Sequence, residues 1–593
     1  MKLRIKKLIA AAAAAVLLLS GMPVTASAYT PSYTTVKIGL YYGSNAKVSA
    51  NLQNAVGAGY LFGYYNANRK FVSVGAYTTT AQISVLKDYT MYYDGSNNTY
   101  EVGSSGSIVV GCYHIQLNSA YSSYNAAKTV ADQYADGFVK FYNSKFYVCI
   151  GSYTSYSAAS SAISSRGIGS CDVNSGTSYT VTVVETKTGK ILFEYDCGTS
   201  SSLGILPATS AMISTAKTAA ANGTYGSQNY AVSNGCTTWF RGYKYYGGFQ
   251  YTRLNGGDLT VVNFVDIEDY VKGVIPYEMS PSWPLEALKA QAVCARSYVA
   301  SHYNAHSSSG FDLCTTEDCQ VYYGTNSATT TSDSAVTGTK GKYLLYNGSP
   351  CEAYFASSDG GATENSENVW VAAVPYIRGV IDPYEADIAD SVSGYYFTIT
   401  FSQSEITSRL QSWGYSCGTI VSMHVSTYTP TGNVYALTLK DANGKTFTFE
   451  KEDAKFIVRA SSLHFTVNNE PIKTAAGGSA TVYVNDASSQ LTITDPTKIY
   501  AQGSSGSSVL GSGSIYVIDG TGAKTTLPMS GTTGSTSLIP TNYTGNASSF
   551  VINGSGNGHN LGMSQWGAYS MAKYHSKTYD EILKFYYTGV TIG

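Results

Sequence analysis

The pattern of apolar and polar positions separates stretches that favour strands from stretches that favour helices. Residues 29 to about 200 alternate short apolar runs with polar turns, a spacing typical of strands. Within this region a strand-like run at 113–117 is followed by the helical segment SYNAAKTVADQY, the alternating run FYNSKFYVCIGSY and a second helical segment, TSYSAASSAI. The pattern therefore predicts a small module with βαββα order.

The pattern changes from about residue 201. LTVVNFVDIEDYVKGVIPYEM predicts a strand followed by a short helix or turn, and residues 284–304 predict a long helix. A cysteine-containing loop at 306–324 and strands from about 342 to 467 follow. Helices return at the end of the chain, where Thr578 and Glu581 have the spacing of a capping box.

Residues 468–548 are rich in Ser, Gly and Thr and contain only short β-like runs. They lack the apolar content that a core needs, so they are interpreted as a β-rich or flexible insertion. At 593 residues the chain is too long for one core. We therefore expect a multidomain α+β protein, with one region at 29–200 and a mixed α/β domain at 201–593 that contains this insertion.

The first 28 residues have the features of a secretory signal peptide. A basic start is followed by an apolar stretch and by Ala26-Ser27-Ala28, a typical cleavage pattern. No later run of 18 apolar residues is present, so no transmembrane segment is expected after cleavage. The sequence predicts a protein that is secreted or held in the cell wall.

Composition narrows the classes of ligand. A net charge of -1 argues against nucleic acid, which requires a basic face. Charged residues make up only 13% of the chain, whereas Tyr occurs 53 times. Tyrosine rings suit the faces of sugars, although a β-rich extracellular protein also uses Tyr in its strands.

Glu278 lies in an apolar run just before the predicted helix at 284–304. The macrodipole of that helix and a nearby cation are expected to hold an anion there. Lys289 and Arg296 are seven residues apart and lie beside the apolar stripe of the helix. They either serve a site with Glu278 or extend along the edge of the stripe to water.

A second group of polar residues lies in the loop after this helix. Two cysteines with four residues between them, and with His and Asp nearby, can supply ligands for tetrahedral zinc. A disulfide or two free thiols are the alternatives. A zinc ion here would be structural and would hold the loop; its candidate ligands are His306, Cys314, Asp318 and Cys319.

Two distant motifs resemble those of the SpoIID (stage II sporulation protein D) or LytB family of peptidoglycan lytic transglycosylases. They are VIPYEMSPSWPLEALKAQAVCARSY at 274–298 and GNGHNLGMSQWGA at 556–568, with further matching segments between them in the family's order. The resemblance covers roughly 205–593 apart from the insertion. In the N-terminal region the βαββα order resembles the SPOR domain, which binds peptidoglycan glycan strands, but other small α+β domains share this order.

The resemblance implies cleavage of the bond between N-acetylmuramic acid and N-acetylglucosamine without water. Glu278 matches the catalytic glutamate, and its pKa should be raised so that it begins protonated. The cations should therefore meet the substrate and not Glu278; Glu268 and Asp269 are the next candidates for the acid. The residues expected to line the glycan site are Lys289, Arg296, His559, Ser564 and Gln565.

The family also suggests other roles. Some members bind zinc with a His where this chain has Asp318, and some act in sporulation-linked wall remodelling or assist an amidase. The signal peptide differs from the membrane anchor of sporulation members. The main alternative is a non-catalytic peptidoglycan binder that enhances an N-acetylmuramoyl-L-alanine amidase; a structural surface protein would leave the ordered motifs unexplained.

Overall fold

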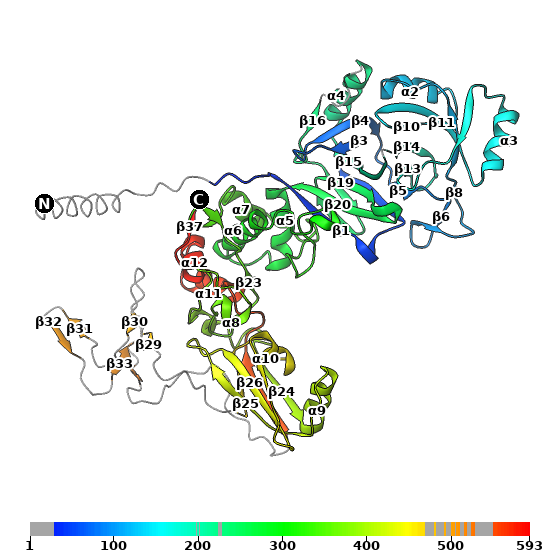
Figure 1. The fold of residues 1–593 in the computed structure, drawn as a ribbon. Coiled ribbons are helices and arrows are strands. Elements are labelled where there is room, and N and C mark those ends of the chain that lie inside the picture. The colour runs from blue at the N-terminus through cyan, green and yellow to red at the C-terminus, as the bar shows by residue number, and fades with distance from the viewer. Residues whose placement is uncertain are drawn as a thin grey trace, which may run out of the picture.

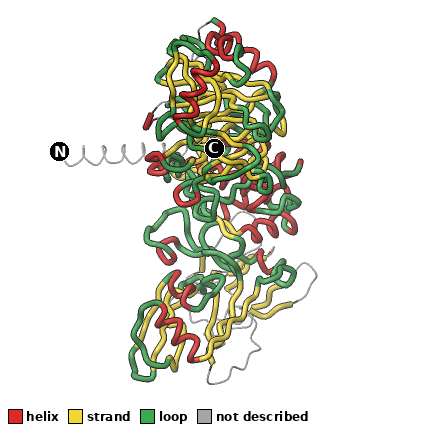
Figure 2. The backbone as a smooth tube through the Cα atoms, turned by 90° about the vertical axis from the view of Figure 1, so that its right-hand side faces the viewer, coloured by secondary structure: helices red, strands yellow, loops and turns green. Residues whose placement is uncertain are grey.

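The computed structural model describes residues 29–468 and 549–593, except for 197, 201, 223 and 225–227, and three short strand pairs between 469 and 548. The predicted signal peptide lies outside the described residues. The chain forms three tiers (Figure 1, Figure 2): an upper β-rich tier from residues 29–266, a middle helical tier from 267–395 and 556–593, and a lower tier from 396–467 and 549–555. The upper and middle tiers share one hydrophobic core, and the lower tier has its own.

The first large sheet of the upper tier is antiparallel throughout. It carries helix α4 (Ser210–Ala221) against β3 and β4. The strand order is β1 (Thr35–Tyr41), β20 (Leu259–Asp266), β19 (Gly248–Arg253), β15 (Leu203–Ala208), β3 (Gly59–Tyr65), β4 (Phe71–Thr78) and β16 (Asn229–Tyr230).

The second large sheet of the upper tier contains both parallel and antiparallel pairs. Its strand order is β12 (Cys171–Asn174), β9 (Tyr113–Leu117), β11 (Lys145–Tyr153), β10 (Gly137–Tyr142), β14 (Ile191–Asp196), β13 (Val181–Glu185), β5 (Ile83–Lys87), β2 (Ser49–Val56), β17 (Thr237–Phe240) and β18 (Tyr243–Tyr246). A small sheet of β7 (Thr99–Val102), β6 (Met91–Asp94) and β8 (Val109–Val110) lies beside it.

The βαββα order predicted from the sequence is present. The elements are β9, α2 (Tyr124–Ala131), β10, β11 and α3 (Tyr156–Arg166), and β12 completes them. The sheet order β12-β9-β11-β10 is that of a split βαβ motif. Ser123 and Ser155 cap the two helices through their side chains, which explains where each helix begins.

The boundary expected near residue 200 does not separate two sheets. β15 lies after this boundary and pairs with β3 before it, and β20 pairs with β1. β17 likewise pairs with β2. Residues 203–266 therefore complete the sheets of the N-terminal region, and they connect it directly to the helical tier through α5 (Ile267–Glu278).

The middle tier is built around α6 (Leu285–Ser301), the long helix predicted from the sequence. Nearly all of it from Ala287 to Val299 is buried, so it is a central helix and not one with a single buried stripe. Helices α5, α7 (Thr330–Gly338), α11 (Gln565–Tyr574) and α12 (Tyr579–Tyr586) pack against it, and α8 (Ser366–Val369) lies nearby. The capping box of Thr578 and Glu581 at α12 is confirmed.

Two small sheets close the middle tier. β21 (Leu344–Tyr346) pairs with β22 (Ser349–Pro350) and with β37 (Thr591–Ile592), near the C-terminus. β23 (Phe355–Ala356) pairs in parallel with β36 (Met563–Ser564). The second pair places the closing motif GNGHNLGMSQWGA, residues 556–568, beside β23.

The lower tier contains two three-stranded sheets with α9 (Gln403–Ser412) and α10 (Glu452–Ile457). One sheet has the order β24 (Tyr396–Ser402), β35 (Ser549–Ser555), β28 (Phe465–Val467), and the other β25 (Ile420–Tyr428), β26 (Val434–Asp441), β27 (Thr446–Glu450). β28 and β35 are antiparallel neighbours, so residues 468–548 are an insertion between two paired strands.

Within the insertion the structure describes three antiparallel strand pairs. They are β29 (Ala480–Thr481) with β30 (Thr492–Ile493), β31 (Tyr500–Gly503) with β32 (Gly506–Val509), and β33 (Ile515–Ile518) with β34 (Lys524–Leu527). In the described part of the chain, no helix is both long and apolar enough to cross a membrane.

Candidate functional site

Glu278 is the last residue of α5, and its side chain is half-buried. Its Oε1 accepts a hydrogen bond of 2.7 Å from the backbone N–H of Val321, and its Oε2 lies 3.5 Å from Nε2 of Gln565. Burial raises the pKa of Glu278, and the negative charge of Glu317 adds to this effect; the two hydrogen bonds act in the opposite direction. The raised pKa of Glu278 was expected from the sequence.

The helix dipole that acts on Glu278 differs from the one expected from the sequence. Helix α6 begins only at Leu285, beyond the short range over which its N-terminus acts. Glu278 instead lies at the C-terminal end of α5, where unpaired carbonyl groups disfavour an anion. The end of α5 therefore favours a neutral carboxyl at this position, whereas the N–H of Val321 favours the carboxylate.

Neither predicted cation contacts Glu278. Nζ of Lys289 lies 2.7 Å from Glu286, one turn earlier on α6. Arg296 donates from Nε and Nη2 to the two oxygens of Glu268, at 3.0 and 2.7 Å. The expectation that the cations avoid Glu278 agrees with this geometry.

The substrate-contact role expected for Arg296 does not fit its surroundings. Its side chain is fully buried, and Nη1 donates to the carbonyl groups of Ala292 and Lys342 in addition to the Glu268 pair. The same Glu268 accepts a hydrogen bond from the backbone N–H of Gly341. Arg296 therefore joins α5, α6 and the 341–342 turn, and it has no face left for a ligand.

Gln565 is the one residue of the closing motif that reaches Glu278. His559 donates from Nε2 to the carbonyl of Phe355, and its Nδ1 accepts from the N–H of Leu561. Burial lowers the pKa of His559 to about 4, so the ring is neutral at physiological pH. His559 thus holds the motif against β23.

Ser564 belongs to a buried carboxyl cluster. Its hydroxyl caps α11 and also donates to Glu385, which accepts three further hydrogen bonds from Ser358 and from the N–H groups of Asp359 and Gly360. Carboxylate oxygens of Asp359, Asp382 and Glu385 all lie within 4.8 Å of one another.

Asp359 and Asp382 of this cluster favour their protonated forms. Burial, followed by the neighbouring charge of Glu385, raises the pKa of Asp382 to about 7 and that of Asp359 well above its ordinary value. Because four donors already occupy Glu385, it has little capacity left for a metal ion. The cluster is therefore a structural support behind the N-terminus of α11, the helix that carries Gln565.

Three of the four candidate zinc ligands come together. One ligand atom each from His306, Cys314 and Cys319 lies within 4.8 Å of the others, and Nε2 of His306 is 3.2 Å from Sγ of Cys319. Asp318 does not join this group, because its side chain is exposed. Cys314 and Cys319 are both free, so the disulfide alternative is not formed.

The chemistry of the three residues fits a metal ion with a preference for sulfur and nitrogen. The hydrogen bond between the two thiols lowers the pKa of Cys314 and raises that of Cys319, so the pair shares a proton that a zinc ion, which binds thiolates, would displace. His306, Cys314 and Cys319 would supply three of the four ligands that zinc takes in structural sites. The group lies on the loop that leads to Val321, so a bound ion would fix the approach of this segment to Glu278.

Comparison with known proteins agrees with the motifs around Glu278. The family model described as SpoIID, stage II sporulation protein, matches residues 255–346. An uncharacterised protein of Brachyspira hyodysenteriae is 32% identical over 353 residues, which are 59% of this chain and 73% of that protein. The chain belongs to the SpoIID family.

Two named relatives match shorter shares of their own length. The amidase enhancer of Bacillus subtilis is 31% identical over 335 residues, 54% of this chain and 40% of that protein. The stage II sporulation protein D of Bacillus amyloliquefaciens is 36% identical over 166 residues, 25% of this chain and 46% of that protein. The chain thus spans less than half of either named relative.

The SpoIID match contains one part of the site and leaves out the other. Glu278, both predicted cations and the His306–Cys319 loop lie inside residues 255–346. Gln565 lies outside this range and directly follows β36, the strand that pairs with β23. The N-terminal split βαβ module also lies outside the range.

Sequence reasoning missed three contributors to the site of this SpoIID protein. The N–H of Val321 carries no side-chain signal, and Glu317 was not distinguished from other charges of the cysteine loop. Tyr323, two residues after Val321, packs edge-on against Tyr277 with ring centroids 5.5 Å apart. The run CQVYYG directly after the loop was the signal available for Tyr323.

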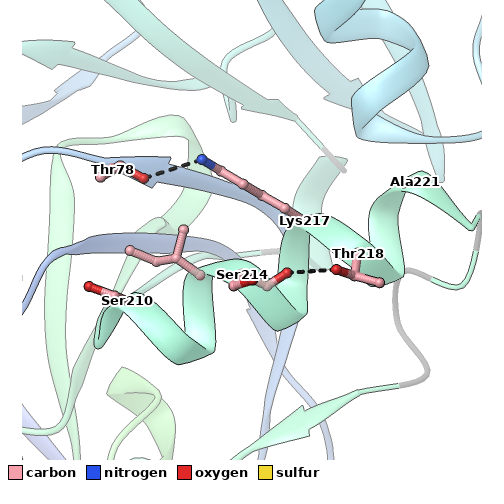
Figure 3. Close-up of a pocket in the computed structure, with 7 residues that line it drawn as sticks. Thr78, Ser210, Ser214, Lys217, Thr218 and Ala221 are labelled. Atoms are coloured by element: carbon pink, nitrogen blue, oxygen red, sulfur yellow. Dashed lines mark hydrogen bonds between the residues drawn. The ribbon is translucent and has the colours of Figure 1, made fainter.

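A separate hollow of about 500 Å³ lies beside α4 (Figure 3). Hydroxyl groups and Lys217 line it, and Nζ of Lys217 donates to Thr78 across its rim at 3.2 Å. None of the predicted site residues lines this hollow. It is therefore not part of the arrangement around Glu278.

Proposed function

We propose that this SpoIID-family protein is an exported lytic transglycosylase that cleaves peptidoglycan glycan strands, with Glu278 as its acid and base. The observation that supports this best is the environment of Glu278: half-buried, with a raised pKa, and with no contact to Lys289 or Arg296. A carboxyl of this kind holds a proton to a higher pH than an exposed glutamate, as a general acid requires.

One carboxyl is enough for this reaction. Protonated Glu278 gives its proton to the glycosidic oxygen as the bond from the anomeric carbon of N-acetylmuramic acid to that oxygen breaks. The resulting carboxylate takes the proton of the 6-hydroxyl of the same sugar, and the 6-oxygen bonds to the anomeric carbon. The products are a free 4-hydroxyl on N-acetylglucosamine and a 1,6-anhydro end, and no water is consumed.

Other residues position this carboxyl. The N–H of Val321 fixes Oε1 of Glu278, and Gln565 approaches Oε2, so a donor orients each oxygen of the carboxyl group. A zinc ion held by His306, Cys314 and Cys319 would be structural and would stiffen the segment that carries Val321. The split βαβ module is proposed to bind glycan as SPOR domains do, and the 1–28 leader to direct the protein to the cell wall.

A second candidate function rests on one relative. The Bacillus subtilis protein that matches 54% of this chain is named an amidase enhancer. In this alternative the chain holds peptidoglycan for a cell-wall amidase and cuts nothing itself. A link to sporulation, which the named stage II sporulation proteins suggest, is compatible with either function.

Digestion of purified cell-wall sacculi by residues 29–593 distinguishes the two functions. The transglycosylase hypothesis predicts soluble fragments that are each lighter by one water than the corresponding hydrolysis products. Mass spectrometry measures this difference. Glu278→Gln should abolish their release and keep sacculus binding, whereas Glu450→Gln, on the exposed face of β27, should leave release unchanged. Sacculus binding without any release by the wild-type chain would favour the enhancer.

A further inference from the structure

Three tyrosine rings form a row that starts beside Glu278. Tyr277 precedes it in the chain and meets Tyr323 edge-on, with centroids 5.5 Å apart and ring planes at 82°. Tyr323 in turn stacks on Tyr243 of β18, with centroids 5.2 Å apart and planes at 21°. Tyr243 and Tyr323 are each 37% exposed, so both offer ring surface to a ligand.

The row is held rigidly with respect to Glu278. Val321 binds Glu278, and a few residues later the N–H of Thr325 donates to the carbonyl of Lys244 at 2.8 Å. Asn326 accepts from the N–H of Lys244 and donates to the carbonyl of Gly242, at 2.7 and 2.9 Å. The segment that carries Tyr323 is therefore fixed to Glu278 at one end and to the β17–β18 hairpin at the other.

Gly324 allows this close approach. Its φ is +71°, and a Cβ at this position would lie 2.3 Å from the carbonyl oxygen of Lys244. Only glycine adopts this conformation at this distance without strain. The stacking of Tyr323 on Tyr243 thus depends on a backbone contact that no other residue permits.

The row ends at a small hollow with a cation at its rim. The hollow has a volume of about 50 Å³, and Tyr41, Arg241, Thr315 and Tyr323 are among its lining residues. This volume is too small for a sugar ring, but it accepts a small substituent. A sugar ring would therefore have to lie on the exposed parts of the two stacked tyrosine rings, with only its substituent in the hollow.

The charge at the hollow is positive. Arg241 is exposed on the hairpin turn, and its guanidinium carbon lies 5.1 Å from the ring centroid of Tyr41. Nζ of Lys47 lies 4.7 Å from the same centroid. Within the described residues Arg241 forms no ion pair, so its charge is available to an anion.

We propose that Tyr323, Tyr243 and Arg241 form a binding site for a pyranose that carries a carboxylate. The sugar ring packs on the two tyrosines, and the carboxylate meets Arg241 at the hollow. The inference rests on the proposed function, because it makes this site the continuation of the glycan strand away from Glu278. The carboxylate belongs either to the lactyl group of a peptide-free muramic acid or to a stem peptide.

Binding to the full mature chain with Glu278→Gln, which leaves the glycan uncut, tests this site. Isothermal titration compares three oligosaccharides of equal length: peptide-free muramyl glycan, peptide-bearing muramyl glycan, and chitooligosaccharide, which has no carboxylate. Tyr323→Ala and Tyr243→Ala should each weaken binding of all three about tenfold, because each removes a ring that carries the sugar. Tyr323→Phe should keep the affinity, because it keeps the ring.

Arg241→Gln should weaken only the ligands whose carboxylate it contacts. Loss with the peptide-free glycan identifies the lactyl carboxylate, and loss confined to the peptide-bearing glycan identifies the stem. Tyr89→Ala and Lys584→Gln, an exposed tyrosine and an exposed lysine outside the row, are the matched controls and should change nothing. Any glycan bound by the N-terminal module adds the same background to every variant.

Unchanged affinity in folded Tyr323→Ala and Tyr243→Ala proteins would overturn the site, as would an equal effect of Arg241→Gln on all three ligands. The site would also be overturned if the chain with all three residues intact bound none of the three oligosaccharides. If the row binds glycan but the wild-type chain releases no anhydro products, the proposed function fails and this inference stands. If the wild-type chain releases anhydro products but the tyrosine variants bind glycan as before, the proposed function stands and this inference fails.

Discussion

The two ends of helix α5 each carry a glutamate, and their surroundings are opposite. Glu268 lies in the first turn, where it forms a two-pronged ion pair with the buried Arg296. Glu278 is the last residue, where it has no cationic partner and accepts hydrogen bonds only from neutral donors. The helix field favours a carboxylate at the first position and disfavours it at the second.

The difference shows how one short helix separates a structural carboxylate from a candidate catalytic acid. Arg296 cannot serve both glutamates, because it is buried and four of its five N–H donors are engaged by Glu268 and by backbone carbonyls. Burial at Glu278 is therefore not compensated by a charge, and its pKa rises. Glu268 was the reserve candidate for the acid, and its ion pair with Arg296 makes it unsuitable as a proton donor.

The largest effect is expected on stability, from a change at Glu268, which forms the ion pair at the start of α5. Glu268→Gln leaves the charge of Arg296 buried without a partner, so the free energy of unfolding should fall by about 3–5 kcal/mol. Chemical denaturation measures this change. The activity of the molecules that remain folded should be close to that of the wild-type protein, because Glu268 takes no part in proton transfer.

The double variant Glu268→Gln/Arg296→Met provides the control. It removes both charges and should recover much of the lost stability, because a buried pair is often replaced by apolar residues at little cost. If Glu268→Gln instead kept full stability and lost activity per folded molecule, the roles of the two glutamates would be reversed.

A smaller effect is expected from changing the charges around Glu278. The acid form is active, so activity should fall as pH rises through the raised pKa of Glu278. Glu317→Gln removes a like charge that raises this pKa, so the alkaline limb of the pH–rate profile should move to lower pH. Gln565→Leu removes a donor that lowers this pKa, so the same limb should move to higher pH.

Glu317→Asp is the matched variant, because it keeps the charge and should keep the limb in place. The readout is kcat/KM against pH on soluble glycan strands. Movement of the limb in the same direction for Glu317→Gln and Gln565→Leu would show that the titrating group is not Glu278.

Local features of the fold followed from the sequence. The apolar spacing from Leu285 to Val299 predicted α6, and the Thr578–Glu581 spacing predicted the start of α12. The βαββα order from residue 113 to 166 was also predictable from the apolar pattern, and Ser123 and Ser155 cap its two helices. These features depend on residues close together in the chain.

Features that depend on distant residues did not follow. The pairing of β1 with β20 joins residues more than 200 positions apart, and no periodicity records such a pairing. For the same reason the glycan-site role that the family resemblance implied for Arg296 does not fit: the partner that buries it, Glu268, comes from α5.

The candidate site was predictable as far as side chains determine it. Glu278, Gln565 and three of the four zinc candidates come together around one segment, residues 306–323. Asp318 was included for its proximity in sequence, but the loop turns its side chain outward. The N–H of Val321 is common to every residue type, so only the structure could identify it.

Titration of Glu278 in the intact protein measures whether its carboxyl keeps a proton above the ordinary range. Carbon NMR of the mature chain labelled at the glutamate side-chain carboxyl carbons, with Glu278→Gln to assign the signal, gives the midpoint. We expect a midpoint above 4.5, the ordinary value for glutamate, because burial raises the pKa of Glu278. A midpoint at or below 4.5 would mean that the carboxyl is already ionised when glycan binds, and it would contradict the proposed chemistry.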